Sequence, residues 1–153
     1  MPVRLSKEPI ISRDDLREVA DVRLMEAEAL LKARQYAGAV YLGGYAVECY
    51  LKVAVCVTLG WDALLATFKT HDLDGLIRYS GFEGRLREDA GVFESFAKIV
   101  DMWTIDTKDN RERKQSVRYR RPSEFDEPTA KRFLQYVGDP ATGVVPWLRK
   151  VIS

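Results

Sequence analysis

The stretch that decides the fold runs from residue 37 to residue 59 and reads AGAVYLGGYAVECYLKVAVCVTL. It is apolar on nearly every side and is followed by Gly60, a residue type favoured just beyond a helix C-terminus. We therefore predict a buried helix over 37–59. Its length suits a membrane span, but Glu48 and Lys52 fall in its middle, where charges are costly in a bilayer. We expect the core helix of a protein that does not enter a membrane.

Small side chains recur along this helix at Ala39, Gly43, Gly44 and Ala46. Each glycine costs about 1 kcal/mol of helix propensity relative to alanine. Close packing of a neighbouring helix is the expected compensation.

Outward from this segment, apolar residues recur at helical spacing in both directions. Ser12 followed by two acids is typical of a helix N-terminus, and a polar stretch over 32–36 separates that first helix from the second. Asp126 as cap and Pro128 in the first turn predict a later helix start. The predicted helices cover residues 12–31, 37–59, 71–79 (begun by Thr70 and stopped near Gly81), 92–103, 126–137 and 144–152, with shorter pieces over 61–68.

The chain of 153 residues, 46% hydrophobic and 31% charged, fits one globular domain spanning 1–153. No alternating pattern typical of strands rises above the helical one, so we predict an all-α fold, an up-down bundle of four to five helices. Residues 1–11 are expected to form an extended arm and residues 104–121 a charged loop. The N-terminus lacks the apolar run of a secretory signal, which favours a cytoplasmic location.

Cys49 and Cys56 lie seven residues apart in one predicted helix, so their Cα atoms are separated by about 10.5 Å. A disulfide needs less than about 7 Å, and we expect two reduced, buried thiols. With a single histidine in the chain, we predict no metal site. The absence of a glycine-rich phosphate loop likewise predicts no cofactor.

Residues 28–52, EALLKARQYAGAVYLGGYAVECYLK, resemble the first two helices of HEPN-domain proteins, which form a hairpin ending in a Glu and a Lys four residues apart. His71-Asp72-Leu73 and Arg118-Tyr119 follow in the order of that family. The resemblance implies a bundle of four or five helices that dimerises through its core helices. It also implies a metal-independent RNA-cleaving toxin, paired with a small nucleotidyltransferase-like antitoxin.

The catalytic signature of that family is an Arg separated from a His by four to six residues. Here the corresponding positions before His71 hold Leu64, Leu65 and Ala66, so the signature is absent. The resemblance therefore implies the fold and a binding function, without the usual catalytic pair.

The catalytic candidates are His71, Glu48, Lys52 and Arg118. Glu48 and Lys52 have the favourable i, i+4 order for a helical ion pair, and in apolar surroundings they either fix the register of the bundle or line a site. His71 is predicted at a helix N-terminus, where the dipole disfavours a cationic imidazole, and it is either a structural residue or an acid/base. If it acts, Arg118 and Tyr119 are its expected partners.

Residues 108–121 contain seven Lys and Arg against two acids, a local charge of +5 in a chain of net charge +1. Cations in this segment suit RNA phosphates, and Trp103 and Tyr119 could stack on bases. The alternative is a solvated loop between two helices. The candidate residues for binding nucleic acid or nucleotide are Lys108, Arg111, Arg113, Lys114, Arg118, Tyr119, Arg120 and Arg121.

Three functions follow from the sequence. The first is a homodimeric HEPN-like module that binds RNA, nucleotide or a nucleotidyltransferase-type partner without cleavage. The second is a metal-independent ribonuclease that uses a non-standard site. The third is a purely structural helical subunit.

Overall fold

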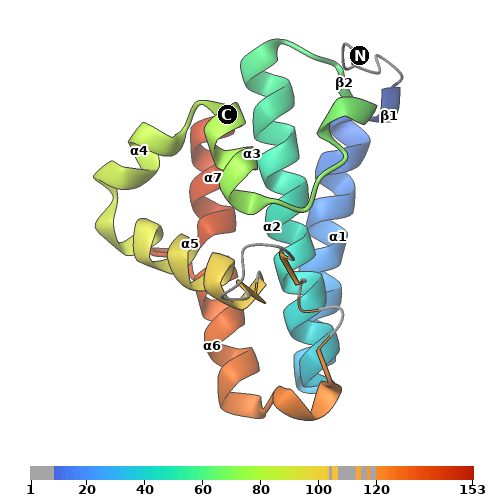
Figure 1. Cartoon of the computed structure of the whole chain (residues 1–153), viewed down its shortest axis with the longest axis vertical. Coiled ribbons are helices and arrows are strands. Elements are labelled where there is room, and N and C mark those ends of the chain that lie inside the picture. The colour runs from blue at the N-terminus through green and yellow to red at the C-terminus, as the bar shows by residue number, and fades with distance from the viewer. Residues whose placement is uncertain (1–8, 104, 107–112, 115–116, 118–119) are drawn as a thin grey trace.

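The structure is a computed structural model of the chain and describes residues 9–103, 105–106, 113–114, 117 and 120–153 (Figure 1). This part contains seven α-helices, two short antiparallel pairs of strands and two short 3-10 helices. In chain order they are β1 (Pro9–Ser12), α1 (Arg13–Lys32), α2 (Tyr36–Leu59), β2 (Ala63–Leu65), η1 (Ala66–Phe68), α3 (Leu73–Ser80), α4 (Glu83–Glu88), α5 (Ala90–Trp103), β3 (Ile105–Asp106), β4 (Arg113–Lys114), η3 (Pro122–Glu124), α6 (Glu127–Gly138) and α7 (Val144–Ile152).

The helix α1 begins where the sequence predicts. The side chain of Ser12 accepts a hydrogen bond from the backbone N–H of Asp15, and acids occupy the first turn. After a turn at 33–35 the chain reverses into α2, so that α1 and α2 pack as an antiparallel hairpin (Figure 1). The predicted polar break between the first two helices is confirmed.

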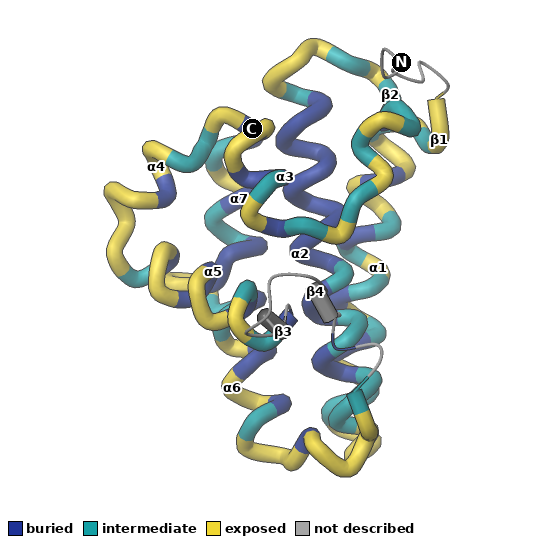
Figure 2. The backbone as a smooth tube through the Cα atoms, viewed as in Figure 1, coloured by how far each residue is buried: buried dark blue, intermediate teal, exposed yellow. Residues whose placement is uncertain are grey.

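The helix α2 is the centre of the fold and is buried along most of its length (Figure 2). It contacts α1, α3, α6 and α7 and ends at Gly60, whose φ of 66° lies in the left-handed region. In the described part of the chain it is the one helix long and apolar enough to cross a membrane, but 72% of its most apolar window is buried inside the protein. It is therefore a core helix, packed on most of its surface by the rest of the chain.

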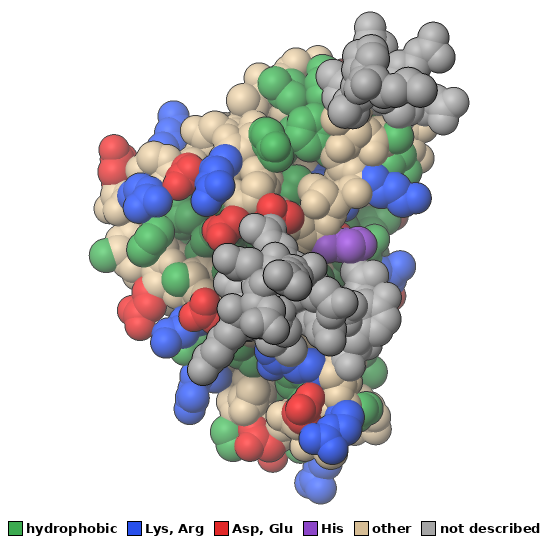
Figure 3. Space-filling model, in the orientation of Figure 1, with side chains coloured by type: hydrophobic (Ala, Val, Ile, Leu, Met, Phe, Trp, Pro, Cys, Tyr) green, Lys and Arg blue, Asp and Glu red, His purple; other side chains and the backbone are tan. Residues whose placement is uncertain are grey.

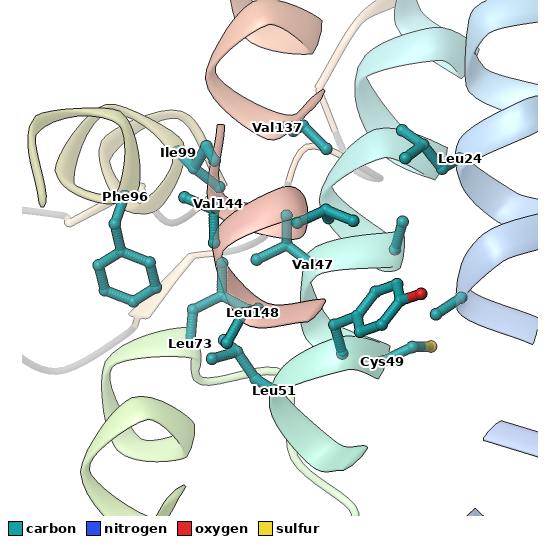
Figure 4. Packing of buried hydrophobic residues seen from close by; sticks show 14 of the residues in the cluster. Leu24, Val47, Cys49, Leu51, Leu73, Phe96, Ile99, Val137, Val144 and Leu148 are labelled. Atoms are coloured by element: carbon teal, nitrogen blue, oxygen red, sulfur yellow. The ribbon is translucent and has the colours of Figure 1, made fainter. Parts of the chain in front are cut away.

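The core lies where side chains of α2 meet α3, α5 and α7. Figure 4 shows Val47 and Leu51 of α2 beside Leu148 of α7 and Leu73 of α3, with Ile99 of α5 higher in the view. All five are at most 1% exposed. The amphipathic helices predicted over 71–79, 92–103 and 144–152 supply these faces, so their apolar periodicity is confirmed.

The glycines of α2 permit close approach within the chain itself. A Cβ at Gly44 would lie 2.3 Å from two ring atoms of Trp103, and one at Gly43 would lie 2.6 Å from Leu134 Cδ2. The prediction of close packing is confirmed, with α5 and α6 as the neighbours. These contacts fill the space beside Gly43 and Gly44 with side chains of the same chain.

Three features differ from the sequence-based expectation. The described part has seven α-helices, against the four to five expected for the bundle: six lie where a helix was predicted, and the six-residue α4 is too short to display a helical period. The predicted arm is extended over Pro9–Ser12, but this part pairs as β1 with β2, and Ile11 faces Leu64 in the register. Within the predicted loop, β3 pairs with β4. The all-α class stands, since both pairs are small.

Candidate functional site

The candidate site is built around Glu48, which projects from the buried centre of α2 and is 0% exposed. Its Oε2 lies 3.4 Å from Lys52 Nζ, and its Oε1 lies 2.6 Å from His71 Nδ1. Burial of a carboxylate is costly unless it is paired and hydrogen-bonded. Here both oxygens have a partner, so the three residues form one connected group.

Lys52 is the buried cation of this group, with a side chain only 10% exposed. The predicted i, i+4 pair with Glu48 is confirmed. The Lys52 charge offsets that of the carboxylate, which allows both groups to remain inside the fold.

His71 is the exposed member, with 54% of its side chain accessible (Figure 3). It lies directly before the N-cap of α3, so the helix predicted from about His71 starts two residues later than expected. The helix α3 begins at Leu73, its cap is Asp72, which accepts from the backbone N–H of Gly75, and Thr70 instead accepts from the N–H of Asp72. The imidazole makes a direct contact with the Glu48 carboxylate.

The contact with Glu48 assigns the tautomer of His71. An ionised carboxylate only accepts hydrogen bonds, so Nδ1 carries the proton and donates it to Oε1. In a neutral ring Nε2 is then an acceptor, and no residue in the described part of the chain hydrogen-bonds it. An exposed imidazole nitrogen, oriented from behind by a buried carboxylate, can accept a proton from a bound molecule.

Trp103 holds the backbone of His71. Its indole Nε1 donates to the His71 carbonyl oxygen over 3.3 Å. The predicted base-stacking role of Trp103 is wrong, because the ring is 1% exposed and packs on Tyr41, with ring centroids 6.1 Å apart and planes at 8°.

The remaining predicted residues are only partly described. The backbone of Arg113 and Lys114 forms β4, and Arg121 is exposed. Arg120 is half-buried, and its Nε has no hydrogen-bond partner among the described residues. The structure brings His71, Glu48 and Lys52 together. The candidates Lys108, Arg111, Arg118 and Tyr119 lie outside the described residues.

A second polar cluster joins α1, α2 and α7 and was not predicted. Arg149 donates to the Tyr50 hydroxyl from Nε at 3.0 Å and to Asp21 Oδ1 at 2.7 Å, and the Tyr50 hydroxyl also donates to Asp21. Burial opposes ionisation of Asp21, but the hydrogen bonds from Tyr50 and Arg149 outweigh it and lower the pKa of the carboxyl. Spacings of 29 and 128 residues leave no local signal for these contacts in the sequence.

A hollow of about 320 Å³ lies among α3, α4 and α5. Its apolar lining includes Ile77 and Phe96, and at its rim Arg87 is paired with Glu83 over 3.0 Å. It is separate from the group around Glu48.

The part of the chain that the structure describes contains no metal site. Among the described residues, no group of three or more His, Cys, Asp and Glu is placed to hold an ion. Both cysteines are free and buried, as predicted. Burial raises the pKa of the Cys49 thiol to about 11, so this thiol is protonated at neutral pH.

Comparisons with known proteins give no family for this chain: no family model, no curated protein and no solved structure matches it.

Proposed function

We propose that this protein is a HEPN-like helical module that acts on RNA as a metal-independent ribonuclease, with His71 as the acid/base. The observation that carries the proposal is the 2.6 Å contact between buried Glu48 and the exposed imidazole of His71. Of the functions that the sequence suggests, this geometry favours the second.

The proposed reaction needs an acid/base, its orienting carboxylate and a cation for the phosphate. His71 Nε2 removes the proton of a ribose 2′-hydroxyl, and the 2′-oxygen attacks the adjacent phosphorus. The bond to the 5′-oxygen breaks, and the imidazolium returns its proton to that oxygen, leaving a 2′,3′-cyclic phosphate. Glu48 holds the ring and stabilises its protonated form. We propose Arg118, as expected from the sequence, as the cation that stabilises the phosphate.

Cleavage of a structured RNA in the presence of EDTA tests the proposal. Wild-type protein is expected to cut, and His71→Ala is expected to reduce the rate by about 10²-fold or more. Arg132→Ala, on the exposed face of α6, is the control and should cut at the wild-type rate. Equal rates for His71→Ala and the control would refute the proposal.

The second candidate function is RNA or nucleotide binding without cleavage, favoured by the local charge of +5 over residues 108–121. Binding through phosphates is salt-dependent, with a slope of about −0.7 per contact for single strands. Replacement of Arg120 and Arg121 by Gln should weaken binding and flatten that slope. Binding that is salt-dependent but never followed by cleavage would select this function over the first.

We also propose, from the resemblance alone, a cytoplasmic homodimer with a nucleotidyltransferase-like partner. Light scattering is expected to report about twice the 17.5 kDa of one chain. Co-expression with the product of the adjacent reading frame tests the partner. A 17.5 kDa particle at working concentration would exclude the homodimer.

A further inference from the structure

Trp103, the last residue of α5, connects the core of the bundle to His71. Its ring is fixed on one side by Gly44, which leaves no room for a Cβ, and it stacks on Tyr41. Its Nε1–H reaches the carbonyl oxygen of His71 at 3.3 Å. One buried side chain therefore spans from the central helix to the backbone of the exposed histidine.

Within the described part of the chain, the other backbone hydrogen bonds next to His71 are local. His71 lies between η1, which ends at Phe68, and α3, which begins at Leu73, so its own peptide groups are outside both helices. Neighbouring bonds are local ones, from the Thr70 N–H to the Phe68 carbonyl and from the Asp72 N–H to Thr70. Glu48 holds the imidazole, whereas Trp103 holds the main chain to which the imidazole is attached.

We propose that Trp103 is a positioning residue for His71: its indole N–H holds the His71 carbonyl so that Nδ1 stays against Glu48 and Nε2 faces the substrate. Proton transfer depends on placement to within a fraction of an ångström, and a displacement of 1 Å can cost about 10²-fold in rate. The kinetic part of this inference rests on the proposed ribonuclease activity. The structural part does not.

The variant Trp103→Phe removes the donor and keeps an aromatic ring. Because His71 is the only histidine in the chain, a nitrogen-correlated NMR spectrum contains a single imidazole. Wild-type protein is expected to show the Nδ1–H tautomer. Trp103→Phe is expected to lose part of that population to Nε2–H, and to lower kcat about tenfold with KM unchanged.

Trp61→Phe is the matched control, since the Trp61 ring packs edge-on against Phe68, with ring centroids 5.4 Å apart. It should leave both the tautomer and kcat as in wild type. If Trp103→Phe does not fold, Gly44→Ala supplies the test, because the added methyl displaces the same ring.

The inference is overturned if Trp103→Phe, or Gly44→Ala in its place, retains the wild-type imidazole signals. If wild-type protein does not cleave RNA, the proposed activity fails, and the tautomer populations alone then decide the role of Trp103. A shifted tautomer with unchanged kcat would support the role of Trp103 in holding the His71 backbone, but would refute its role in catalysis.

Discussion

Glu48 is a fully buried charged residue. At 0% exposure its carboxylate is shared by a buried ammonium and a half-exposed imidazole. Replacement of a whole buried ion pair by apolar side chains is often neutral, whereas removal of one partner leaves an uncompensated charge. The cost of changing Lys52 therefore depends on whether Glu48 is changed with it.

Lys52→Met should destabilise the protein by about 3–5 kcal/mol, since it removes the cation paired with the buried Glu48 carboxylate. The double variant Glu48→Leu/Lys52→Met should recover most of that loss. Urea unfolding monitored by circular dichroism measures both. The exposed pair of Lys131 and Glu127, at 2.8 Å and also i, i+4, is the control, and Lys131→Met should leave the midpoint unchanged. Additive losses in the double variant would contradict the assigned pairing.

The sequence predicted one of the two contacts that Glu48 makes in this group. The spacing of Glu48 and Lys52 specified their pairing, because residues four apart share a helix face. The contact of His71 with Glu48 joins residues 23 apart, and no helical period relates them. The start of α3 differs from the sequence-based prediction by two residues, because Thr70 and Asp72 are both good caps and only the fold selects Asp72.

At the scale of elements, α2 is specified by its apolar composition and by Gly60, and its neighbours by their amphipathic faces. The boundaries of α7 and the end of α2 agree with the sequence, since strong signals end each of them. The sequence did not predict α4 or the strand pairs, because elements of two to six residues have too few positions to show a hydrophobic period. Strand β2 depends on a partner more than fifty residues away.

Gly44→Ala is expected to destabilise the protein although alanine is the better helix former. The new Cβ would meet Trp103 at 2.3 Å, and overpacking of this kind costs about 1–3 kcal/mol. Gly84→Ala in α4 is the control, since nothing lies within 4 Å of its Cβ position, and it should stabilise by up to about 1 kcal/mol. Thermal unfolding of both variants checks the sign. A stabilised Gly44→Ala would refute the close packing of α2 and α5.

At the scale of the molecule, the cluster of Asp21, Tyr50 and Arg149 joins the first helix, the central helix and the last. The guanidinium of Arg149 also lies over the Tyr50 ring, 5.4 Å from its centroid. The hydrogen bond to Tyr50 raises the pKa of Arg149, despite the opposing effect of burial, so the pair with Asp21 stays charged at neutral pH. The sequence predicts the order of the elements, but not the contacts that join the last helix to the first two.

The cluster predicts a loss of stability in acid. Because the folded-state pKa of Asp21 lies below its ordinary value of 3.8, the contribution is complete above about pH 5. It is lost as the pH falls through 3.8 toward the folded value. Urea midpoints measured from pH 6 to pH 2.5 should fall less steeply for Asp21→Asn than for wild type. Asp74→Asn, on the exposed face of α3, is the control, and identical slopes for Asp21→Asn and wild type would contradict the network.

The same cluster has a consequence for the order of folding. The hairpin of α1 and α2 is built from contacts between residues close in sequence, which form quickly, whereas Arg149 meets Asp21 across 128 residues. We expect contacts that close so long a loop to form after the transition state, which already buries most of the surface buried in the native protein. Weakening the contacts of α7 with this cluster is then expected to speed unfolding and to leave the folding rate nearly unchanged.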